Sequence, residues 1–379
     1  MHDVIVVGVG AMGSATCWQL AKRGARVLGI EQYDVPHALG SSGGHSRLIR
    51  LAYYEHPDYV PLLRRAYELW REIERDSGRT LLFETGGLYL GREDEPFVAE
   101  SLRAARRHDL PHELLDRAQL RTRFPQFRVR DDHVGFFEPA AGALLSEDAI
   151  AAFAAAAQRR GAEIRTREAV VDWRCDDAGV TVRTDRATHR AAHVVFCAGA
   201  WSERLLRDVG DDLGAPPLVV TRQVMGWVAP PDPAPFALGA FPCWAIQNDD
   251  GSLHYGMPIL PGAAGLKIAH HFHGPATDVA TVDRTPRAAD EDDFRPALRQ
   301  LLPGADGPLA AMKVCLYTCS PDSHFIVGRT LERRATVACG FSGHGFKFAS
   351  VMGEALADLS TRGATELPIG FLGVNRFAS

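Results

Sequence analysis

The N-terminal 31 residues contain the pattern that most limits what this chain can fold into. The apolar, β-branched run Val4–Val7 is typical of a buried parallel strand. Gly8, Gly10 and Gly13 follow at G-x-G-x-x-G spacing, and a helix is expected over Ala11–Arg23. In such a turn the first glycine permits a sharp bend, the second lets a pyrophosphate approach, and the third lets helix and strand pack closely. The sequence therefore predicts a Rossmann-like dinucleotide-binding unit.

The second expected strand, Val27–Ile30, ends beside an acidic residue. Gly24 closes the preceding helix, and Glu31 follows the strand at its carboxyl end. An acid at this position binds a ribose 2′-hydroxyl, so we expect an adenosine without a 2′-phosphate. The helix N-terminus points its free N–H groups at the phosphates. A glycine-rich turn in an unrelated α/β protein is the alternative, and the motif alone does not separate NAD from FAD.

Length and composition narrow the remaining possibilities. The chain has 379 residues, for which two domains are usual, and its net charge of −5 gives no reason to expect nucleic acid or an anionic membrane. No apolar run approaches roughly 20 residues, and the N-terminus leads directly into the first strand without room for a signal peptide. The seven cysteines lack metal-ligand spacing. We expect a reduced, cytoplasmic protein without a metal site.

The order of expected elements divides the chain into two discontinuous domains. The expected fold class is α/β combined with α+β: a Rossmann-like domain of residues 1–83, 143–215 and 320–379, and a mostly antiparallel β substrate domain of residues 84–142 and 216–319. Pro216 and Pro217 mark the change to antiparallel strands. Expected helices and strands include 59–76, 95–107, 117–124, 148–160 and 290–302, and 219–228, 243–247, 254–257 and 266–273.

Two further turns of the first domain suit a bound dinucleotide. The strand His193–Cys197 is followed by small residues that include Gly199, and then by Trp201. A second loop, residues 41–46, is rich in glycine and serine and includes Ser42. Arg47 and Arg50 follow it at i, i+3 and can reach a carboxylate or phosphate from one side. Two solvated arginines are the alternative.

Lysine is rare in this chain, which makes each lysine informative. Of the 42 basic residues only four are lysine: Lys22, Lys267, Lys313 and Lys347. Side chains alternate along a strand, so Lys267, Ala269 and His271 share one face, and so do Lys313, Cys315 and Tyr317. The two strands can thus bring a lysine, a histidine, a cysteine and a tyrosine to one cavity. Edge strands with polar outer faces are the alternative.

The C-terminal region repeats the order of strand, glycine-rich turn and helix. The strand Thr336–Ala338 precedes a turn over residues 339–345 that includes Gly343 and Gly345, and a helix then runs to Leu359. A helix N-terminus after such a turn attracts negative charge, and Lys347 adds a full positive charge there. We expect this turn to face a group that becomes negatively charged.

The combined motifs resemble those of a known family. They are Gly8-x-Gly10-x-x-Gly13, Ser46-Arg47-Leu48-Ile49-Arg50, Tyr255-Gly256-Met257-Pro258, Gly265-Leu266-Lys267, Cys315-Leu316-Tyr317-Thr318 and the stretch from Gly340 to Phe348. This set resembles the monomeric sarcosine oxidase and N-methyltryptophan oxidase family, in the flavin amine oxidase group that includes D-amino acid oxidase. The resemblance covers nearly the whole chain, and the last motif is the most specific.

For the cofactor, the resemblance implies FAD in the Rossmann-like domain. Cys315 matches the cysteine that bonds covalently to the 8-methyl carbon of the flavin, and Arg47 matches a basic residue packed near the flavin ring. Lys267 matches the lysine that promotes flavin reoxidation by oxygen. The residues expected to hold the cofactor are Gly8, Gly10, Gly13, Glu31, Ser42, Arg47, Gly199, Trp201, Cys315, Gly343, Gly345 and Lys347.

For the substrate, the resemblance implies a cavity for an amino acid. Arg50 and Lys347 match the pair that binds the substrate carboxylate, and His271 matches an active-site histidine. The residues matching the rest of the cavity lining are Tyr255, Tyr317 and His344.

The chain departs from the family pattern at two places. Gly43 stands where the family carries a histidine near the flavin, and His45 lies two residues further on, which bears on covalent attachment. Ala245 stands where sarcosine oxidase carries methionine, which enlarges the expected cavity.

The sequence thus predicts a flavin-dependent oxidase of secondary amino acids, such as sarcosine or another N-methyl amino acid. The expected products are an imine, then an amine and an aldehyde, with oxygen reduced to hydrogen peroxide. A dehydrogenase of the same fold and an oxidase of cyclic imino acids such as pipecolate or proline are the alternatives, and a flavin-binding module without turnover is a third. The expected partners are the amino acid and O2, without nucleic acid or membrane, and a monomer is expected.

Overall fold

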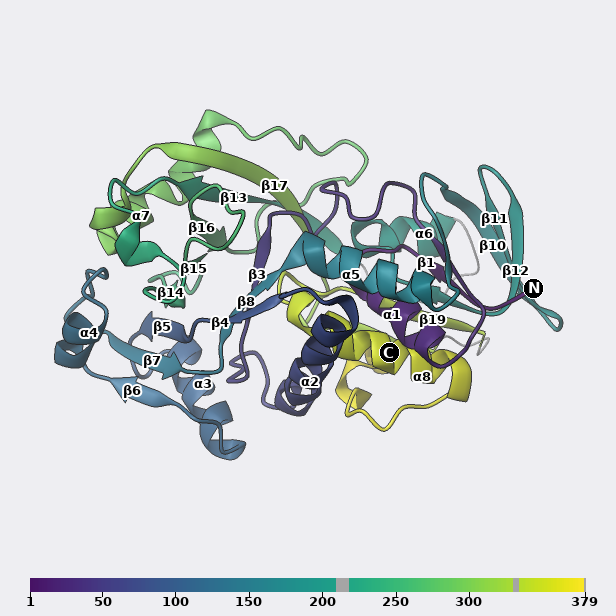
Figure 1. Cartoon of the computed structure of the whole chain (residues 1–379), viewed down its shortest axis with the longest axis horizontal. Coiled ribbons are helices and arrows are strands. Elements are labelled where there is room, and N and C mark those ends of the chain that lie inside the picture. The colour runs from purple at the N-terminus through teal and green to yellow at the C-terminus, as the bar shows by residue number, and fades with distance from the viewer. Residues whose placement is uncertain (209–217, 330–333, 378–379) are drawn as a thin grey trace.

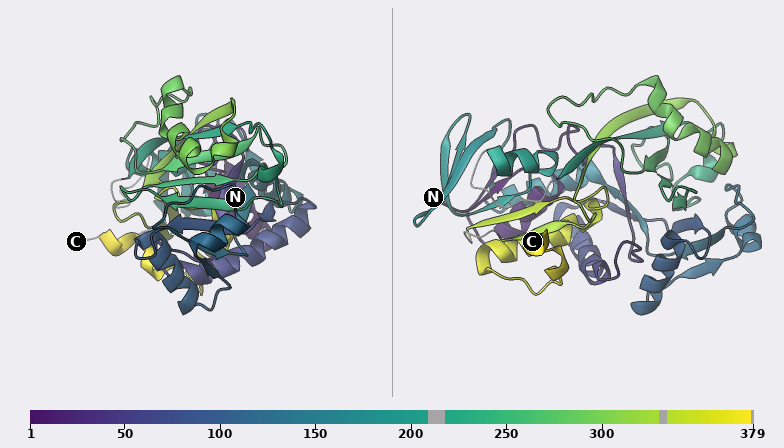
Figure 2. Two further views of the ribbon diagram at one scale, coloured as in Figure 1. Left: turned by 90° about the vertical axis from the view of Figure 1, so that its left-hand side faces the viewer. Right: turned by 180° about the vertical axis from the view of Figure 1, so that it is seen from behind.

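The computed structural model describes residues 1–208, 218–329 and 334–377. Two eight-stranded sheets lie at opposite ends of an elongated molecule, and long strands and loops run between them (Figure 1). The view from behind shows the same separation, with the C-terminal helix under the sheet that contains the N-terminus (Figure 2). The expected combination of a parallel and a mostly antiparallel sheet is therefore confirmed.

The first sheet is built around the N-terminal strand. Its order is β10-β11-β12-β1-β2-β9, and β19 pairs with β12 and with β18. The contacts of β1 with β2 and β12, of β2 with β9 and of β12 with β19 are parallel. The strands are β1 (His2–Val7), β2 (Val27–Ile30), β9 (Glu163–Arg165), β10 (Val170–Asp176), β11 (Gly179–Thr184), β12 (Thr188–Phe196), β18 (Ile326–Arg329) and β19 (Ala335–Cys339).

Helices cover one face of the parallel strands. The helix α1 (Ala11–Lys22) packs between α5 (Ser146–Arg159) and α8 (Ala349–Arg362) (Figure 1). The contact with α8 is close because a Cβ at Gly353 would lie 2.6 Å from the backbone carbon of Ala15. In a sheet of this kind a ligand binds at the carboxyl ends of the parallel strands, which here are the ends of β1, β2 and β12.

The second sheet has the order β17-β13-β16-β15-β14-β5-β7-β6, and all its contacts except β14 with β5 are antiparallel. The strands are β5 (Gly87–Gly91), β6 (Glu113–Leu115), β7 (Val134–Glu138), β13 (Val219–Val228), β14 (Cys243–Gln247), β15 (Leu253–Met257), β16 (Leu266–His271) and β17 (Leu309–Cys319).

The register gives this sheet two different faces. On one face Trp244, Ile246 and Ile268 join an apolar core with Phe294. On the other face the alternate residues Ala245, Tyr255 and Ala269 lie opposite one another across three strands. Lys267 and His271 are on this second face, two residues to either side of Ala269. We call it the site face.

A small third sheet links the two large ones. Its order is β3 (Ser46–Ile49), β8 (Gly142–Leu145) and β4 (Leu82–Glu84), and it carries the chain between the two halves of the molecule (Figure 1). We retain the two-domain division of the sequence analysis as a proposal. Its boundary between residues 215 and 216, with Pro216 and Pro217, lies outside the described residues.

One expected helix is wrong. The sequence predicted a continuous helix over residues 290–302, but the structure has a 3-10 helix over Ala288–Asp293 and then the short helix α7 (Arg295–Leu301). The break is at Phe294, whose side chain is fully buried against Gly226. Pro296 lies in the first turn of α7, where its missing N–H group is tolerated, whereas a continuous helix from residue 290 would need that hydrogen bond. The other helices are α2 (Tyr59–Ser77), α3 (Pro96–Arg107), α4 (Arg117–Arg123) and α6 (Ser202–Asp208).

Within the described residues, none of the seven cysteines takes part in a disulfide. Within residues 1–208, 218–329 and 334–377, no helix is both long and apolar enough to cross a membrane. In the same part of the chain, no group of three or more histidine, cysteine or acidic side chains is arranged to hold a metal ion.

Candidate active site

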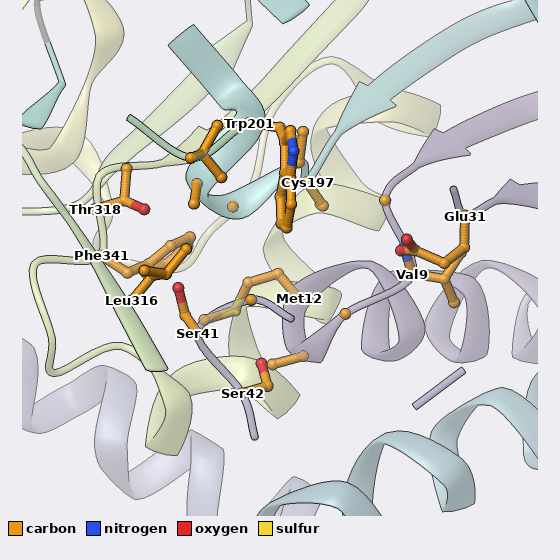
Figure 3. Close-up of a pocket in the computed structure, with 18 of the residues that line it drawn as sticks. Val9, Met12, Glu31, Ser41, Ser42, Cys197, Trp201, Leu316, Thr318 and Phe341 are labelled. Carbon is orange, nitrogen blue, oxygen red and sulfur yellow. The ribbon is translucent and has the colours of Figure 1, made fainter. Parts of the chain in front are cut away.

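A cavity of about 750 Å³ lies at the carboxyl ends of the parallel strands. Glu31 and Val9 lie at one end of the view in Figure 3, and Leu316, Thr318 and Phe341 lie at the other. Trp201, Met12 and Ser41 lie between these ends. An elongated cavity of this kind suits an extended dinucleotide.

The three glycines of the first turn act in different ways. Gly8 has φ +86°, a conformation that favours glycine, and a Cβ at Gly13 would lie only 1.8 Å from the Gly8 carbonyl oxygen. At Gly10 a Cβ would meet nothing within 4 Å, and this residue lines the cavity at the start of α1. Gly13 therefore allows the helix to pack, while Gly10 leaves space beside the helix N-terminus.

Glu31 is fixed at the end of β2. Its side chain lies in the cavity wall and is 4% exposed as a residue. One carboxylate oxygen accepts the Val9 N–H at 2.9 Å, and the other accepts the Tyr33 N–H at 3.1 Å. Each oxygen keeps a lone pair for a ribose hydroxyl. With the open cradle at Gly10, the free helix N-terminus and this acid, the residues present fit an FAD.

Most residues expected at the cofactor lie in the cavity wall. Those that line it are Gly8, Gly10, Glu31, Ser42, Arg47, Gly199, Trp201, Gly343 and Gly345, together with Tyr317. Gly13, Cys315 and Lys347 are buried behind this wall. Trp201 and Tyr33 contact each other there, with ring centroids 5.6 Å apart.

Arg47 and Lys267 hold the loop of residues 41–46 from two sides. Arg47 Nη2 donates to the carbonyl oxygens of Ser41 at 2.8 Å and Gly43 at 2.5 Å. Lys267 Nζ donates to those of Gly44 at 2.9 Å and Ser46 at 2.6 Å. Lys267 is 1% exposed, so the reading of a polar edge strand is wrong for it. Burial, and then the charge of Arg47, holds the pKa of Lys267 well below its ordinary value.

Cys315 lies beside these two cations on the site face. It is 3% exposed and directly precedes Leu316 and Tyr317, which line the cavity. Burial raises the pKa of its thiol, and Arg47 and Lys267 oppose that rise. Two nearby cations favour a thiolate, which is the nucleophilic form of cysteine. Lys313, two residues earlier, is exposed at the outer part of the strand.

His45 does not replace the histidine that is missing at position 43. Its ring lies against Gly262, where a Cβ would be 3.6 Å from the ring, and it does not line the cavity. The backbone N–H of His45 donates to the Glu147 carboxylate at 2.9 Å, and that of Gly44 donates to it at 2.8 Å. A Cβ at Gly43 would approach Ala38 to 3.1 Å, so this loop is closely packed around the glycine.

His271 and Tyr317 meet at the boundary of the cavity. His271 Nδ1 lies 2.9 Å from the Tyr317 hydroxyl, and their rings are 5.3 Å apart. Burial lowers the pKa of His271 to about 3, so the imidazole is neutral at neutral pH. Burial raises the pKa of Tyr255 to about 12, so that phenol keeps its proton. The structure thus brings His271, Tyr255 and Tyr317 together on the site face.

Arg50 lies in an enclosed, charged environment. Its Nη2 donates to Glu55 at 2.6 Å and its Nη1 to the Ala52 carbonyl at 2.6 Å, and Arg50 is 3% exposed. The guanidinium carbon lies 4.4 Å from the ring centre of Tyr53 and 4.8 Å from that of Tyr54. Glu55 is therefore the present anionic partner of the arginine expected to bind a carboxylate.

Lys347 and His344 are both buried near Arg50. Lys347 Nζ donates to the His344 carbonyl at 2.8 Å and approaches the Tyr53 hydroxyl at 3.4 Å. Burial and the charge of Arg50 lower the pKa of Lys347 to about 7. The His344 ring packs against Phe325, with centroids 4.8 Å apart, and its Nδ1 lies 2.6 Å from the Tyr53 hydroxyl. Both ring nitrogens of His344 have protein partners.

Sequence reasoning missed three residues of this region. Glu55 and Tyr53 follow Arg50 in an irregular loop, where no periodicity singles out one residue. Glu138 is the third, and it lies at the end of β7, a strand that was not expected. Its carboxylate accepts the N–H groups of Leu51 at 2.6 Å and Ala52 at 3.2 Å. Of these three residues only Glu55 gave a signal in the sequence, because it is an acidic residue five positions after Arg50.

The chain matches known proteins over nearly its whole length. The family model described as FAD dependent oxidoreductase matches residues 3–359. The chain is 40% identical to a monomeric sarcosine oxidase of Streptomyces avermitilis, over 100% of this chain and 98% of that protein. It is 34% identical to an N-methyl-L-tryptophan oxidase of Yersinia pestis, over 99% of each.

Solved structures show the same fold. NikD, an unusual amino acid oxidase essential for nikkomycin biosynthesis, superimposes with a TM-score of 0.85 at 27% identity, over 98% of this chain and 97% of that one. Glycine oxidase from Geobacillus kaustophilus superimposes with a TM-score of 0.83 at 23% identity, over 100% and 99% of the chains. The chain belongs to the FAD dependent oxidoreductase family, among relatives of the monomeric sarcosine oxidases and N-methyltryptophan oxidases.

Proposed function

We propose that this protein is an FAD-dependent oxidase of secondary amino acids, with N-methyl amino acids as its substrates. The substrate becomes an imine, water hydrolyses the imine to an amine and an aldehyde, and O2 becomes hydrogen peroxide. The observation that carries the proposal is the buried pair Arg50 and Lys347. Lys347 lies two residues after Gly345, which lines the cofactor cavity, so a carboxylate bound by this pair would lie next to the cofactor.

The chain's own residues account for binding and orientation. FAD, when bound, supplies the acceptor for the hydrogen and electron pair of the substrate C–H bond. Arg50 and Lys347 bind the carboxylate and so set the amine at a fixed distance from it. His271 is neutral and hydrogen-bonded to Tyr317, so it does not repel a cationic amine. Tyr317, which lines the cofactor cavity, and the neighbouring Tyr255, which does not, would bound the substrate on the site face.

Substrate binding on this proposal requires an exchange of anions. Arg50 is paired with Glu55, and the arginine is too deeply buried to hold a second carboxylate at no cost. The substrate carboxylate would replace Glu55 and leave the net charge around Arg50 unchanged. Such an exchange favours a carboxylate ligand over a neutral amine.

Lys267 and Cys315 extend the proposal to oxygen and to covalent attachment. The Gly44 and Ser46 carbonyls accept from Lys267 and favour its ammonium form against the effect of burial, and such a compact charge can stabilise the charge that develops on oxygen as it is reduced. This role favours oxygen as the electron acceptor over a quinone or a carrier protein. Cys315 lies in reach of two cations that favour its thiolate, which supports a covalent bond to the flavin. We also propose that the protein is a monomer, and that it acts in a reducing, cytoplasmic compartment, which fits the lack of disulfides among the described cysteines.

A substrate screen tests the oxidase proposal. The protein is incubated with sarcosine, larger N-methyl amino acids, pipecolate and proline, and peroxide is measured with oxygen present and the bleaching of flavin without it. Peroxide from an N-methyl amino acid is expected. Bleaching that is not followed by rapid peroxide release would indicate a dehydrogenase, and preference for pipecolate or proline would indicate a cyclic imino acid oxidase. No bleaching with any substrate contradicts the proposed function.

Variants of the carboxylate pair locate the site. Arg50→Ala and Lys347→Met are each expected to raise KM and to lower kcat/KM by roughly two to four kcal/mol, the cost of a charged pair left half-made. Lys22→Met, in an exposed ion pair with Glu72, is the control and should leave both constants unchanged. Wild-type kinetics in both site variants would rule out this pair.

Acid precipitation tests the covalent bond. Wild-type protein is expected to keep its yellow colour in the precipitate, and Cys315→Ala should release all flavin to the supernatant. Cys319→Ala, a buried cysteine on the same strand, is the matched control and should keep its flavin. Release from the wild type would show that attachment is absent.

A further inference from the structure

A row of buried hydrogen bonds lies behind Lys347, and the proposed reaction does not use it. Lys347 Nζ lies 3.4 Å from the Tyr53 hydroxyl, and that hydroxyl lies 2.6 Å from His344 Nδ1. His344 Nε2 lies 2.9 Å from the Ser323 carbonyl oxygen. Tyr53 is fully buried, and Lys347 and His344 are 6% and 8% exposed. Four groups thus form one connected row.

The Ser323 carbonyl at the end of this row determines which group donates in each hydrogen bond. A carbonyl only accepts, so His344 Nε2 must carry the hydrogen that it gives to Ser323. Burial lowers the pKa of His344 to about 4, so the ring is neutral and Nδ1 has a lone pair. Burial raises the pKa of Tyr53 well above its ordinary value, so Tyr53 keeps its proton. The Tyr53 O–H therefore donates to His344 across the short 2.6 Å contact.

The Tyr53 oxygen then offers only lone pairs on its other side. Lys347 is the group on that side, and it can only be the donor in the contact. A neutral lysine amine could also donate here, but its lone pair would face only acceptors, since the Tyr53 oxygen and the His344 carbonyl both offer lone pairs. The geometry thus favours the charged, donating form of Lys347 over the neutral form.

We propose that Tyr53 is a positioning residue for Lys347: its hydroxyl, oriented by His344, accepts from the Lys347 ammonium and keeps it charged toward the substrate carboxylate. This inference rests on the proposed function, in which Lys347 binds that carboxylate. Tyr53 does not touch the reacting atoms in this scheme. It acts through Lys347, and removing its hydroxyl changes when the lysine is charged.

The surroundings of Lys347 explain why such support is needed. Burial and the charge of Arg50 favour the neutral amine, and Glu55 favours the ammonium. Once a substrate replaces Glu55 at Arg50, the substrate carboxylate takes over the role of that anion. The other titratable groups that face the lysine, His344, Tyr53 and His271 on β16, carry no charge. Trp70 of α2 donates to the backbone carbonyl of Lys347 at 2.8 Å.

The variant Tyr53→Phe removes the hydroxyl and keeps the ring. The ring packs against Tyr59 and Phe348, with centroids 5.0 and 5.3 Å apart, so the holoenzyme should fold. Binding of acetate, a carboxylate that is not oxidised, is measured by calorimetry between pH 5.5 and 8.5. In the wild type, affinity should fall as pH rises through about 7, where Lys347 loses its proton and Glu138, which interacts with Arg50, becomes charged. Only the contribution of Lys347 should move in Tyr53→Phe.

In Tyr53→Phe the fall due to Lys347 should occur at a lower pH. Loss of a hydrogen bond to a charged group corresponds to a shift of about one pH unit, so affinity at pH 7 should drop about fivefold to tenfold. At pH 5.5 both proteins should bind acetate within about twofold of each other, since the lysine is then charged in both. A merely structural role would weaken binding equally at every pH.

Tyr59→Phe is the matched control. Tyr59 lies in the same aromatic group, but its hydroxyl faces His324 Nδ1 and the Phe325 N–H, each at 3.3 Å, and not Lys347. The pH profile of this control should equal that of the wild type. In a Lys347→Met background, Tyr53→Phe should have no further effect on acetate affinity, because the group through which it acts is gone.

The outcomes separate the inference from the proposed function. An unchanged pH profile in Tyr53→Phe, or an added loss in the Lys347→Met background, overturns the role of Tyr53 alone. Acetate affinity that Lys347→Met leaves unchanged overturns both the role of Tyr53 and the assignment of Lys347 to the carboxylate. Acetate binding that follows the expected profile in a protein that oxidises no amino acid supports the inference and contradicts only the oxidase function.

Discussion

The cofactor side and the substrate side of this site consist of different chemical groups. Around the cavity at the first sheet, the protein presents backbone: a glycine turn, the start of α1 and two backbone N–H groups held by Glu31. Around Arg50 and Lys347 it presents buried ionisable side chains with shifted pKa values. A backbone site tolerates changes of pH but not of shape, whereas a site of buried charges responds to both.

The largest effect is expected at Gly13, where the space available to a side chain determines the stability of the fold. In Gly13→Ala the new Cβ would lie 1.8 Å from the Gly8 carbonyl oxygen, a backbone atom, and the position of the Cβ is itself fixed by the backbone of α1, so neither atom can move aside. We expect a loss of more than about 4 kcal/mol in the free energy of unfolding of the apoprotein, beyond ordinary overpacking. Urea unfolding without FAD measures this loss.

Gly10→Ala makes the same change three residues earlier and separates packing from binding. Its Cβ would meet no protein atom within 4 Å, so the apoprotein should keep its stability within about 0.5 kcal/mol. The methyl group would occupy the approach to the phosphates, so affinity for FAD should fall at least about tenfold. Equal destabilisation of the apoprotein by both variants would show that the two glycines do not have separate roles.

The next effect concerns charge, at Glu138. Burial raises its pKa to about 7, above its ordinary value, so the folded protein binds more protons at this residue than the unfolded chain between about pH 4.5 and 7. The stability that this group contributes is full below that window and is lost as pH rises through it, by about 3 kcal/mol. Glu138→Gln should remove this loss.

The measurement compares the two proteins across the window. Urea unfolding at pH 5 and pH 8 should show the wild type losing stability relative to Glu138→Gln by about 2.5 kcal/mol, because part of the loss already occurs below pH 5. The buried His271 and His344 titrate in the opposite sense, but they are the same in both proteins and cancel in the comparison. Glu93→Gln, at an exposed turn, should run parallel to the wild type. Parallel curves for Glu138→Gln would mean that this carboxyl titrates normally.

These two sides also differ in how far the sequence revealed them. The turn with Gly8, Gly10 and Gly13 is a continuous motif, so spacing alone predicted the strand, the helix and the acid of the cofactor side. Alternation along β16 correctly put Lys267 and His271 on one face. Periodicity over short segments is thus enough wherever a single stretch builds the feature.

The substrate side depends on contacts that no local pattern encodes. Glu138 reaches Leu51 across 87 residues of sequence, from a strand that was not expected. The pairing of Arg50 with Glu55, and the way His344 turns inward to Tyr53, are set by burial of the whole cluster. A resemblance to a family named Arg50 and Lys347, but the groups that set their charge became visible only in three dimensions.

The third effect tests whether a buried charge on the site face serves oxygen. Lys267→Met should slow reoxidation about a hundredfold or more, as for a single preorganised electrostatic group, and should leave anaerobic reduction by substrate nearly unchanged. Stopped-flow spectroscopy times the two half-reactions separately. Because Lys267 also holds the Gly44 and Ser46 carbonyls, the anaerobic half-reaction reports any disturbance of that loop.

Lys313→Met is the control for this test. Lys313 is an exposed lysine on β17, two residues before Cys315. Its replacement by methionine should leave both half-reactions at wild-type rates. Equal slowing of both half-reactions in Lys267→Met would assign Lys267 to the loop, and no slowing of either would leave it without a role in turnover.

The smallest effect is expected at Ala245, where a larger side chain would reduce the space on the substrate side. This residue is 3% exposed on β14 and lies in register between Tyr89 and Tyr255 on the site face. Its small side chain, followed across Tyr255 by Ala269, leaves room beside the tyrosines. Ala245→Met fills that room, so kcat/KM for an N-methyl amino acid with a large side chain should fall about tenfold relative to sarcosine. Ile246→Met changes the next residue, which faces the opposite core, and should alter stability without changing that ratio. Should both variants leave the ratio untouched, the substrate side chain does not extend toward β14, and the family difference at position 245 has no bearing on substrate size.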